Sequence, residues 1–239
     1  MIKIFSSHTF SKLLLWWFVL IYFYSCKNYE ATLNPDYTGQ AGQLTDIQGN
    51  TYKTIGIGSQ IWMAENLKTR SFKDNSPIPV ILNDSIWAKL QSPGCCWYNN
   101  DSTNYKELYG TLYNFYAVET GLLCPDGWHV PDASEWSTLG SYLGGPEIAG
   151  GKLKDYYKAY WVEPNPCLLN EYQFYALPGG ERLNYNGSFS QIGVTGFWWT
   201  GTLKKDFEAY SRTMSHSDKS LGLLLNDTRR GYSVRCIKD

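Results

Sequence analysis

The chain has 239 residues, of which 18% are charged and 16% aromatic, and its formal net charge is −1 at pH 7. The sequence shows no stripe or cluster of lysine and arginine, which speaks against nucleic-acid binding. Its length is compatible with one large domain or two small ones, and it suffices to bury a substantial core.

The first 25 residues have the order of a secretory signal peptide. Lys3 and Lys12 are the only charged residues among them, and an apolar run from Leu13 to Phe23 follows. This run has 11 residues, whereas a transmembrane helix needs roughly 20. We therefore expect residues 1–25 to be a cleavable signal that exports the chain.

Cys26 lies just behind the apolar run and is followed by a polar stretch. The segment Phe23-Tyr24-Ser25-Cys26 resembles a bacterial lipobox, although Phe23 and Tyr24 are bulkier than the residues usual there. We therefore expect Cys26 to carry a lipid that anchors the protein in the outer membrane or at the cell surface. The alternative is an ordinary signal peptide with an incidental cysteine, or an uncleaved anchor.

The folded domain is expected to follow a tether. Residues 26–43 contain Asn, Pro, Asp, Gly and Gln with little periodic hydrophobicity, which is typical of a flexible linker. The domain is then expected to span residues 44–239. Near its start, residues 51–57 and 60–67 flank Gly58-Ser59, a two-residue hairpin signal, and we expect both runs to be strands.

The clearest helix signal comes in the middle of the domain. Asp132 and Glu135 have the spacing of a capping box, and two glycines at 144–145 supply the stop. The apolar residues on one face of this helix, which we expect to pack in the core, are Trp136, Leu139 and Leu143. Residues 109–118, which come before this helix, are dense in aromatics and fit either a strand or a helix.

The C-terminal part favours short strands separated by Gly, Asp, Lys and Ser. These predicted strands cover residues 197–200, 208–214, 221–225 and 232–237. Short strands that follow one or two helices predict an α+β domain with an antiparallel sheet.

The cysteines are odd in number once Cys26 is assigned to lipid. The five that remain are Cys95, Cys96, Cys124, Cys167 and Cys236. Export implies a compartment that permits disulfides, so pairing is expected, yet at least one thiol must stay unpaired. None of the spacings is a zinc pattern, and we expect neither a metal nor a cofactor.

Six short runs of the domain resemble a known family. They are DIQGNTY at 46–52, QIWMAENL at 60–67, CWYNND at 96–101, GWHVP at 127–131 leading into Glu135-Trp136, ALPGG at 176–180 and SVRC at 233–236. In this order they resemble the Fibrobacter succinogenes major paralogous domain over about residues 44–239. Members of that family are typically exported, often as lipoproteins, so the resemblance implies an anchored envelope protein without naming a ligand.

A more distant likeness concerns the fold. The GWHVP run and the closing residues 231–236 resemble landmarks of the formylglycine-generating enzyme and C-type lectin superfamily. This likeness implies a C-type-lectin-like α+β domain whose ends meet. It also implies a disulfide between a cysteine near the first helix and one on the last strand, places that Cys124 and Cys236 occupy.

The sequence gives less support to a calcium site or to an enzymatic function. Glu163-Pro164-Asn165 looks like the calcium and sugar motif of C-type lectins, but the downstream candidate Asn226-Asp227 lacks the preceding tryptophan. No cysteine pair of the formylglycine-generator type is present near the C-terminus, and neither His129 nor His216 lies near a nucleophile motif. A carboxylate pair would meet only in space. A cysteine-dependent oxidase or a carboxylate-dependent glycosidase of the envelope thus stays the alternative.

The function we expect is non-catalytic binding or cell-surface structure, with a glycan or a surface protein as ligand. Aromatic rings can stack on sugars or pack against proteins. Trp198 and Trp199 lie on a predicted strand, so one ring can be exposed while the other is buried. The candidate ligand-binding residues are Trp161, Tyr185, Trp198, Trp199 and Tyr210, and burial in the core is the alternative for each.

Overall fold

A computed structural model describes residues 40–155, 159–165 and 169–239. The described residues belong to one compact unit, Thr38–Asp239, with about 33% strand and 19% helix, so the predicted α+β class is confirmed. The predictions for the signal peptide, Cys26, Cys167 and most of the tether lie outside the described residues. No helix in the described part is long and apolar enough to cross a membrane.

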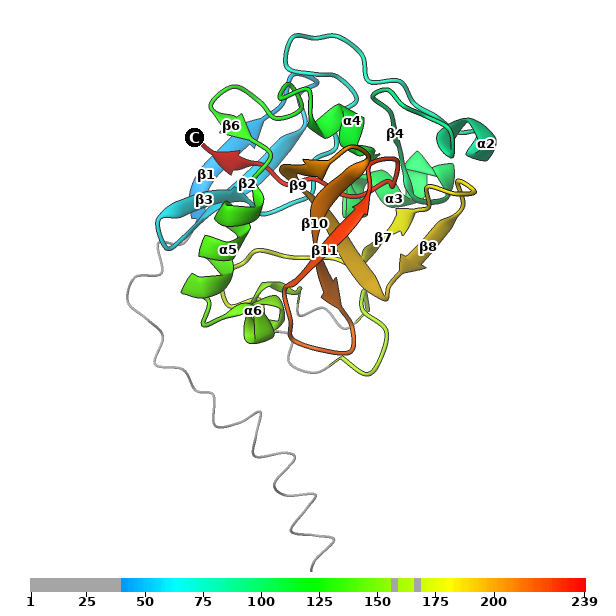
Figure 1. Ribbon diagram of the computed structural model, residues 1–239. Coiled ribbons are helices and arrows are strands. Elements are labelled where there is room, and N and C mark those ends of the chain that lie inside the picture. The colour runs from blue at the N-terminus through cyan, green and yellow to red at the C-terminus, as the bar shows by residue number, and fades with distance from the viewer. Residues whose placement is uncertain (1–39, 156–158, 166–168) are drawn as a thin grey trace, which may run out of the picture. The chain divides into compact units, whose positions relative to one another are not determined.

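The first sheet joins the two ends of the domain. Its strands are β1 (Gln40–Thr45), β2 (Thr51–Ile57), β3 (Gln60–Met63), β6 (Trp128–His129) and β12 (Ile237–Lys238), in the order β1-β2-β3-β12-β6 (Figure 1). Ile237 pairs with Trp62, which places the last strand beside the first hairpins.

Two polar turns shape these hairpins. Asp46 accepts hydrogen bonds from the backbone N–H groups of Gln48 and Asn50, which closes the turn from β1 to β2. Gly58 has a φ of 58°, the left-handed conformation that the predicted β2–β3 hairpin requires. The predicted tether is too long by four residues, because β1 starts at Gln40 and extends its pairing with β2 to Ile55.

The second sheet carries the longest strands. They are β7 (Gly179–Arg182), β8 (Phe189–Ile192), β9 (Thr195–Lys205), β10 (Glu208–Ser215) and β11 (Gly222–Asp227), in the order β11-β10-β9-β7-β8. All pairs are antiparallel except β7 with β9. β4 (Cys95–Cys96) and β5 (Leu112–Tyr113) form a third, two-stranded sheet. Of the predicted strand 232–237 only its last residue is in a strand, because Tyr232 and Ser233 form isolated bridges.

The described residues contain five α-helices, more than the one or two predicted. They are α2 (Asp84–Trp87), α3 (Ser102–Tyr109), α4 (Phe115–Val118), α5 (Ala133–Tyr142) and α6 (Pro146–Leu153), with a 3₁₀ helix at Tyr98–Asn100. Side chains of Asn83, Asp101 and Asn114 accept from first-turn N–H groups and start short helices that periodicity does not reveal. The predicted capping box of Asp132 and Glu135 starts α5, as expected.

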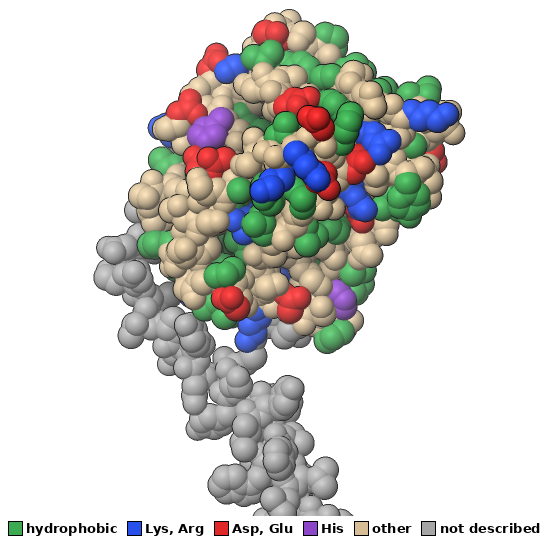
Figure 2. All heavy atoms as spheres, in the orientation of Figure 1, with side chains coloured by type: hydrophobic (Ala, Val, Ile, Leu, Met, Phe, Trp, Pro, Cys, Tyr) green, Lys and Arg blue, Asp and Glu red, His purple; other side chains and the backbone are tan. Residues whose placement is uncertain are grey.

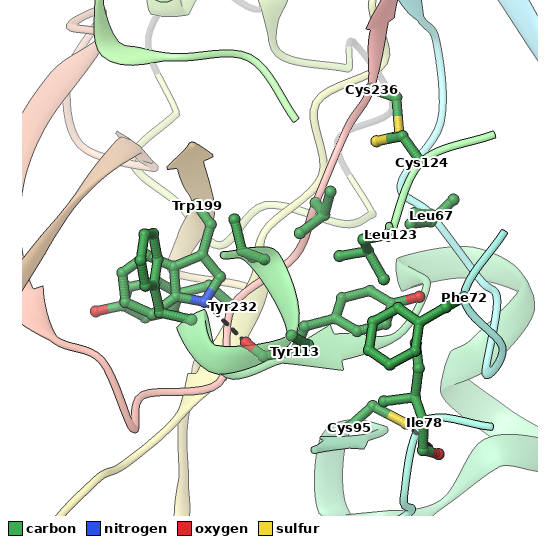
Figure 3. Packing of buried hydrophobic residues seen from close by; sticks show 14 of the residues in the cluster. Leu67, Phe72, Ile78, Cys95, Tyr113, Leu123, Cys124, Trp199, Tyr232 and Cys236 are labelled. Carbon is green, nitrogen blue, oxygen red and sulfur yellow. Dashed lines mark hydrogen bonds between the residues drawn. A yellow bond between two sulfur atoms is a disulfide. The ribbon is translucent and has the colours of Figure 1, made fainter. Parts of the chain in front are cut away.

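The second sheet has a hydrophobic core on each face. Trp199 lies in one buried cluster, shown in Figure 3, where its indole nitrogen donates to the Tyr113 carbonyl oxygen at 2.8 Å. Trp198 points the other way into a second cluster together with Trp136. The first cluster also holds the disulfide between Cys124 and Cys236, at the other end of the view in Figure 3, which confirms the predicted bridge.

Candidate functional site

The predicted ligand-binding rings differ sharply in exposure. Trp198 and Trp199 are both fully buried, so neither can be a ligand-binding ring, and the alternative of burial in the core holds for both. The reason is that strand alternation sends them to opposite faces, and each face is covered by its own core. Trp161 is also buried, with the Lys154 ammonium 5.2 Å from its ring centroid. Tyr210 is half-buried, and only Tyr185 is largely exposed, at 69%.

Tyr185 belongs to a surface built from two segments. It lies in the turn between β7 and β8, and this turn packs against the start of α2, where Leu82 and Ile86 are 54% and 56% exposed. A Cβ atom on Gly187 would lie 2.3 Å from the Asp84 carbonyl oxygen, so only glycine permits this approach. Figure 1 shows the β7–β8 tip beside α2. We call Leu82, Ile86 and Tyr185 the Tyr185 surface.

A buried arginine holds the two segments together. Arg182 is fully buried, and its guanidinium donates to the Ile81 carbonyl oxygen at 2.5 Å and to the Asp84 carboxylate at 2.7 Å. Its Nε donates to the carbonyl oxygen of Gly187 at 2.8 Å. One side chain therefore satisfies acceptors on both segments, and charge-assisted bonds of this kind are the strong ones.

Two aromatic rings pack against that arginine. The guanidinium carbon of Arg182 is 4.6 Å from the ring centroid of Trp87 and 4.8 Å from that of Phe189. Trp87 belongs to α2 and Phe189 to β8, so these contacts also tie the two segments of the surface to each other.

Two further side chains support the α2 segment. Asn100 donates to the Leu82 carbonyl oxygen at 2.8 Å from a left-handed backbone with φ 57°, which asparagine tolerates better than most residues. Arg229, ion-paired with Asp227 at 2.6 Å, donates to the Ala88 carbonyl oxygen. The exposed apolar side chains thus stand on a backbone that is fixed from several directions.

The surface combines apolar area with polar donors. Asn83 and Asn186 are exposed, and each uses its side-chain oxygen to hold a local N–H group, of Ile86 and Ser188 respectively. Among the described residues the amide nitrogens of these two asparagines have no hydrogen-bond partner. They can donate to a ligand, and together with the exposed apolar side chains they suit a ligand that is partly apolar and rich in hydroxyl groups.

A titratable cluster lies elsewhere, around His129. Its Nδ1 is 2.7 Å from Asp239 and its Nε2 is 2.9 Å from Glu135. Partial burial lowers the pKa of His129, but the hydrogen bonds to the two carboxylates outweigh this effect and raise it. With both ring nitrogens engaged, the imidazole is placed to tie the C-terminus to α5 rather than to take a proton from a substrate.

A half-open cleft of about 170 Å³ adjoins this cluster. It is lined by Val118, Glu119, Gly121, Leu123, Cys124, His129, Val130 and Gly201. Partial burial raises the pKa of Glu119. The cleft is small compared with the pockets that usually hold drug-sized ligands.

Two cysteines in the described part of the chain are free, and both are poorly placed for redox chemistry. Cys95 and Cys96 are fully buried and unpaired. Burial raises the pKa of both thiols, that of Cys96 to about 12. A reactive cysteine needs an exposed, electropositive setting that lowers the pKa, which is the opposite arrangement.

The lectin-like motif residues do not come together. The Pro164 carbonyl oxygen is 3.2 Å from Nδ1 of His216, a residue that precedes β11 in the chain. Asp227 is the last residue of β11 and is ion-paired with Arg229. Within residues 40–155, 159–165 and 169–239, no group of three or more His, Cys, Asp or Glu side chains is placed to hold a metal ion.

Several residues of the six runs that resemble the family form a buried polar network. Asn66 Oδ1 accepts from Trp198 Nε1 and from Arg235 Nε, both at 2.9 Å, and its amide nitrogen donates to Tyr109 and Ser233. Asn66 lies in QIWMAENL, and Ser233 and Arg235 lie in SVRC. These two runs therefore contain residues that stabilise the fold. Arg182 and Leu82 lie outside all six runs, and no sequence pattern near them indicated a binding surface.

Comparison with known proteins yields one match. A family model described as the Fibrobacter succinogenes major domain matches residues 55–238. The match begins in β2 and ends in β12, so it contains all of the second sheet and most of the first. No curated protein and no solved structure matches the chain.

Proposed function

The chain belongs to the Fibrobacter succinogenes major domain family, and on that premise we propose that it is a lipid-anchored envelope protein whose domain binds a glycan without catalysis. Export is supported by the signal-like order of residues 1–25, and anchoring by the position of Cys26. More than one acyl chain would be needed for firm attachment, since a single chain gives only marginal membrane binding.

Binding is supported mainly by the Tyr185 surface. Its three apolar side chains are more than half exposed, although the backbone beneath them is held by the fully buried Arg182. Exposed apolar groups on a fixed frame lose little conformational entropy when a ligand binds. A sugar presents apolar C–H faces and hydroxyl groups, and these complement the ring of Tyr185 and the neighbouring amides of Asn83 and Asn186.

We also propose a C-type-lectin-like arrangement for the domain. Two features support it: the last strand, β12, pairs with β3 near the start of the domain, and a disulfide joins Cys124, before the longest helix, to Cys236, beside the last strand. Loops and hairpins carried by such a closed frame are common places for binding sites.

The test is retention of the protein on a panel of immobilised polysaccharides and glycans. We expect Tyr185→Ala to weaken binding about tenfold, equivalent to about 1.4 kcal/mol, because an exposed aromatic anchor is removed. Ile86→Ala should weaken it less. The matched control is Tyr142→Ala, which removes a 37%-exposed tyrosine at the end of α5 and should leave retention unchanged.

Three outcomes would argue against glycan binding at this surface. The first is that no member of the panel retains the protein, and the second is that the Tyr185 and Tyr142 variants are retained equally. The third is that the protein binds a purified surface protein and no glycan. Turnover of a retained glycan would point to an envelope glycosidase. Turnover abolished by thiol-blocking reagents would point to the cysteine-dependent enzyme.

A further inference from the structure

The outer edge of the second sheet is an unusual strand. β11 pairs only with β10, so alternate residues along it direct their N–H and C=O groups away from the sheet. Within the described residues, the backbone of Leu223–Asn226 makes no hydrogen bond to any element other than β10. Polar backbone groups at an open edge are a template for another strand.

The side chains of this edge are apolar on both faces. Leu223, Leu224 and Leu225 are consecutive and are 46%, 45% and 42% exposed. Leu223 and Leu225 stand opposite Arg212 and Tyr210 on one face, while Leu224 stands opposite Ser211 on the other. Figure 2 shows hydrophobic side chains at the surface near the middle of this view, where β10 and β11 run in Figure 1.

A partner that covers the leucines on both faces of β11 must lie alongside this strand. A helix or a flat surface placed over one face would leave Leu224, or else Leu223 and Leu225, in water. A neighbouring strand covers all three and also bonds the open backbone. The usual protections of an exposed edge, a lysine or proline within the strand, are missing between Gly222 and Asn226.

The sequence of β11 is complementary to itself. Antiparallel pairing of two copies about a two-fold axis must be centred on a residue, because paired side chains share a face. Centred on Leu224, the pairing places leucine opposite leucine at three successive positions and keeps five residues of each strand paired within the bounds of β11. No charged residue lies between Gly222 and Asn226, so no like charges meet in the paired segment.

We propose that β11 is the pairing edge of a symmetric dimer, in which it binds antiparallel to β11 of a second copy with Leu224 opposite Leu224. Leu223 and Leu225 of both copies then form a four-leucine cluster on one face, extended by the half-buried ring of Tyr210. Five paired residues per copy make a small interface, so the dimer forms reversibly and depends on concentration. This pairing is independent of the glycan-binding proposal, because the Tyr185 surface lies on other elements.

Cysteine cross-linking of the full-length protein in detergent tests the register. In the proposed pairing, Leu224→Cys places two thiols on opposite residues with Cα atoms about 4.5–5.5 Å apart, within reach of a disulfide. Leu223→Cys puts the two cysteines on a diagonal, about 7–8 Å apart, beyond that reach. We expect mild oxidation to link most of the Leu224→Cys protein into disulfide-bonded dimers. The linked fraction of Leu223→Cys should be about the same as that of the unsubstituted chain. Equal linking of both variants, or linking of neither, would overturn the proposal.

Sedimentation at increasing protein concentration tests the dimer without new thiols. The unsubstituted protein should shift from monomer towards dimer, and Leu224→Lys should raise the concentration needed for half-dimerisation at least about tenfold, because a lysine on the edge opposes its copy. The control is Leu203→Lys, which changes an equally exposed leucine of the same sheet, 47%, on β9 and away from the edge. A monomer at every concentration, or equal behaviour of the two lysine variants, would contradict the pairing.

Discussion

Replacement of Asn66 by alanine should destabilise the protein more than a typical single substitution. Asn66 is 4% exposed, and its side chain makes four hydrogen bonds that join the segment after β3 to β9 and to the C-terminal segment. Alanine leaves the Trp198 indole N–H and the Arg235 Nε–H without this acceptor. Both donors belong to side chains that are 0% and 1% exposed.

The magnitude follows from the groups left unpaired. A buried donor without a partner costs about 1–3 kcal/mol, more when it carries a charge, as the Arg235 guanidinium does. Two orphaned donors therefore predict a loss of about 3–5 kcal/mol, a large part of the roughly 5–15 kcal/mol that stabilises a domain. Asn66→Asp keeps an acceptor for both donors and should lose less.

Urea unfolding followed by tryptophan fluorescence measures these losses. The control, Asn104→Ala, removes an exposed asparagine that bonds only Asp101 and should change the free energy of unfolding by less than about 0.5 kcal/mol. A loss below about 1 kcal/mol for Asn66→Ala, or an equal loss for Asn66→Asp, would refute the reasoning about orphaned donors.

Three more predictions concern the cysteines and His129. Replacing Cys124 and Cys236 by alanine frees a loop whose ends are 112 residues apart and should lower the free energy of unfolding by about 4 kcal/mol in urea titrations; an unchanged midpoint would contradict this. The pKa of His129 is raised in the folded state, so its bonds to Glu135 and Asp239 stabilise fully below about pH 6.5 and are lost as pH rises through the raised pKa. Stability should therefore fall over this window less in His129→Gln than in the unsubstituted protein, and parallel curves would count against the assignment. The two adjacent free thiols should react with a thiol reagent only on unfolding, so rapid labelling of the native protein would show them to be accessible.

Local patterns predicted those elements that local chemistry determines. The capping box of Asp132 and Glu135 starts α5, and Gly58 forms the hairpin turn, because each feature needs only residues a few positions apart. The bridge of Cys124 with Cys236 spans the domain and came from the family likeness instead of from spacing.

The candidate site could not be predicted in the same way. Arg182 reaches the Ile81 carbonyl across 101 residues of sequence, so nothing near either residue announces the contact. The sequence also left open whether Trp198 and Trp199 are buried, for a related reason. Alternation along β9 indicates that the rings point apart, but the coverage of each face comes from segments distant in sequence. Of the five predicted rings, only Tyr185 is exposed enough to act as a platform.

The disulfide also determines what a protease can release. Every loop between Cys124 and Cys236 lies inside the covalent ring that the bridge closes, including the β9–β10 hairpin with the exposed Lys204 and Lys205. A single cut at that hairpin yields two pieces that migrate as one on a non-reducing gel and separate only after reduction. One nick therefore leaves the C-terminal piece covalently bound to the piece that carries the N-terminus.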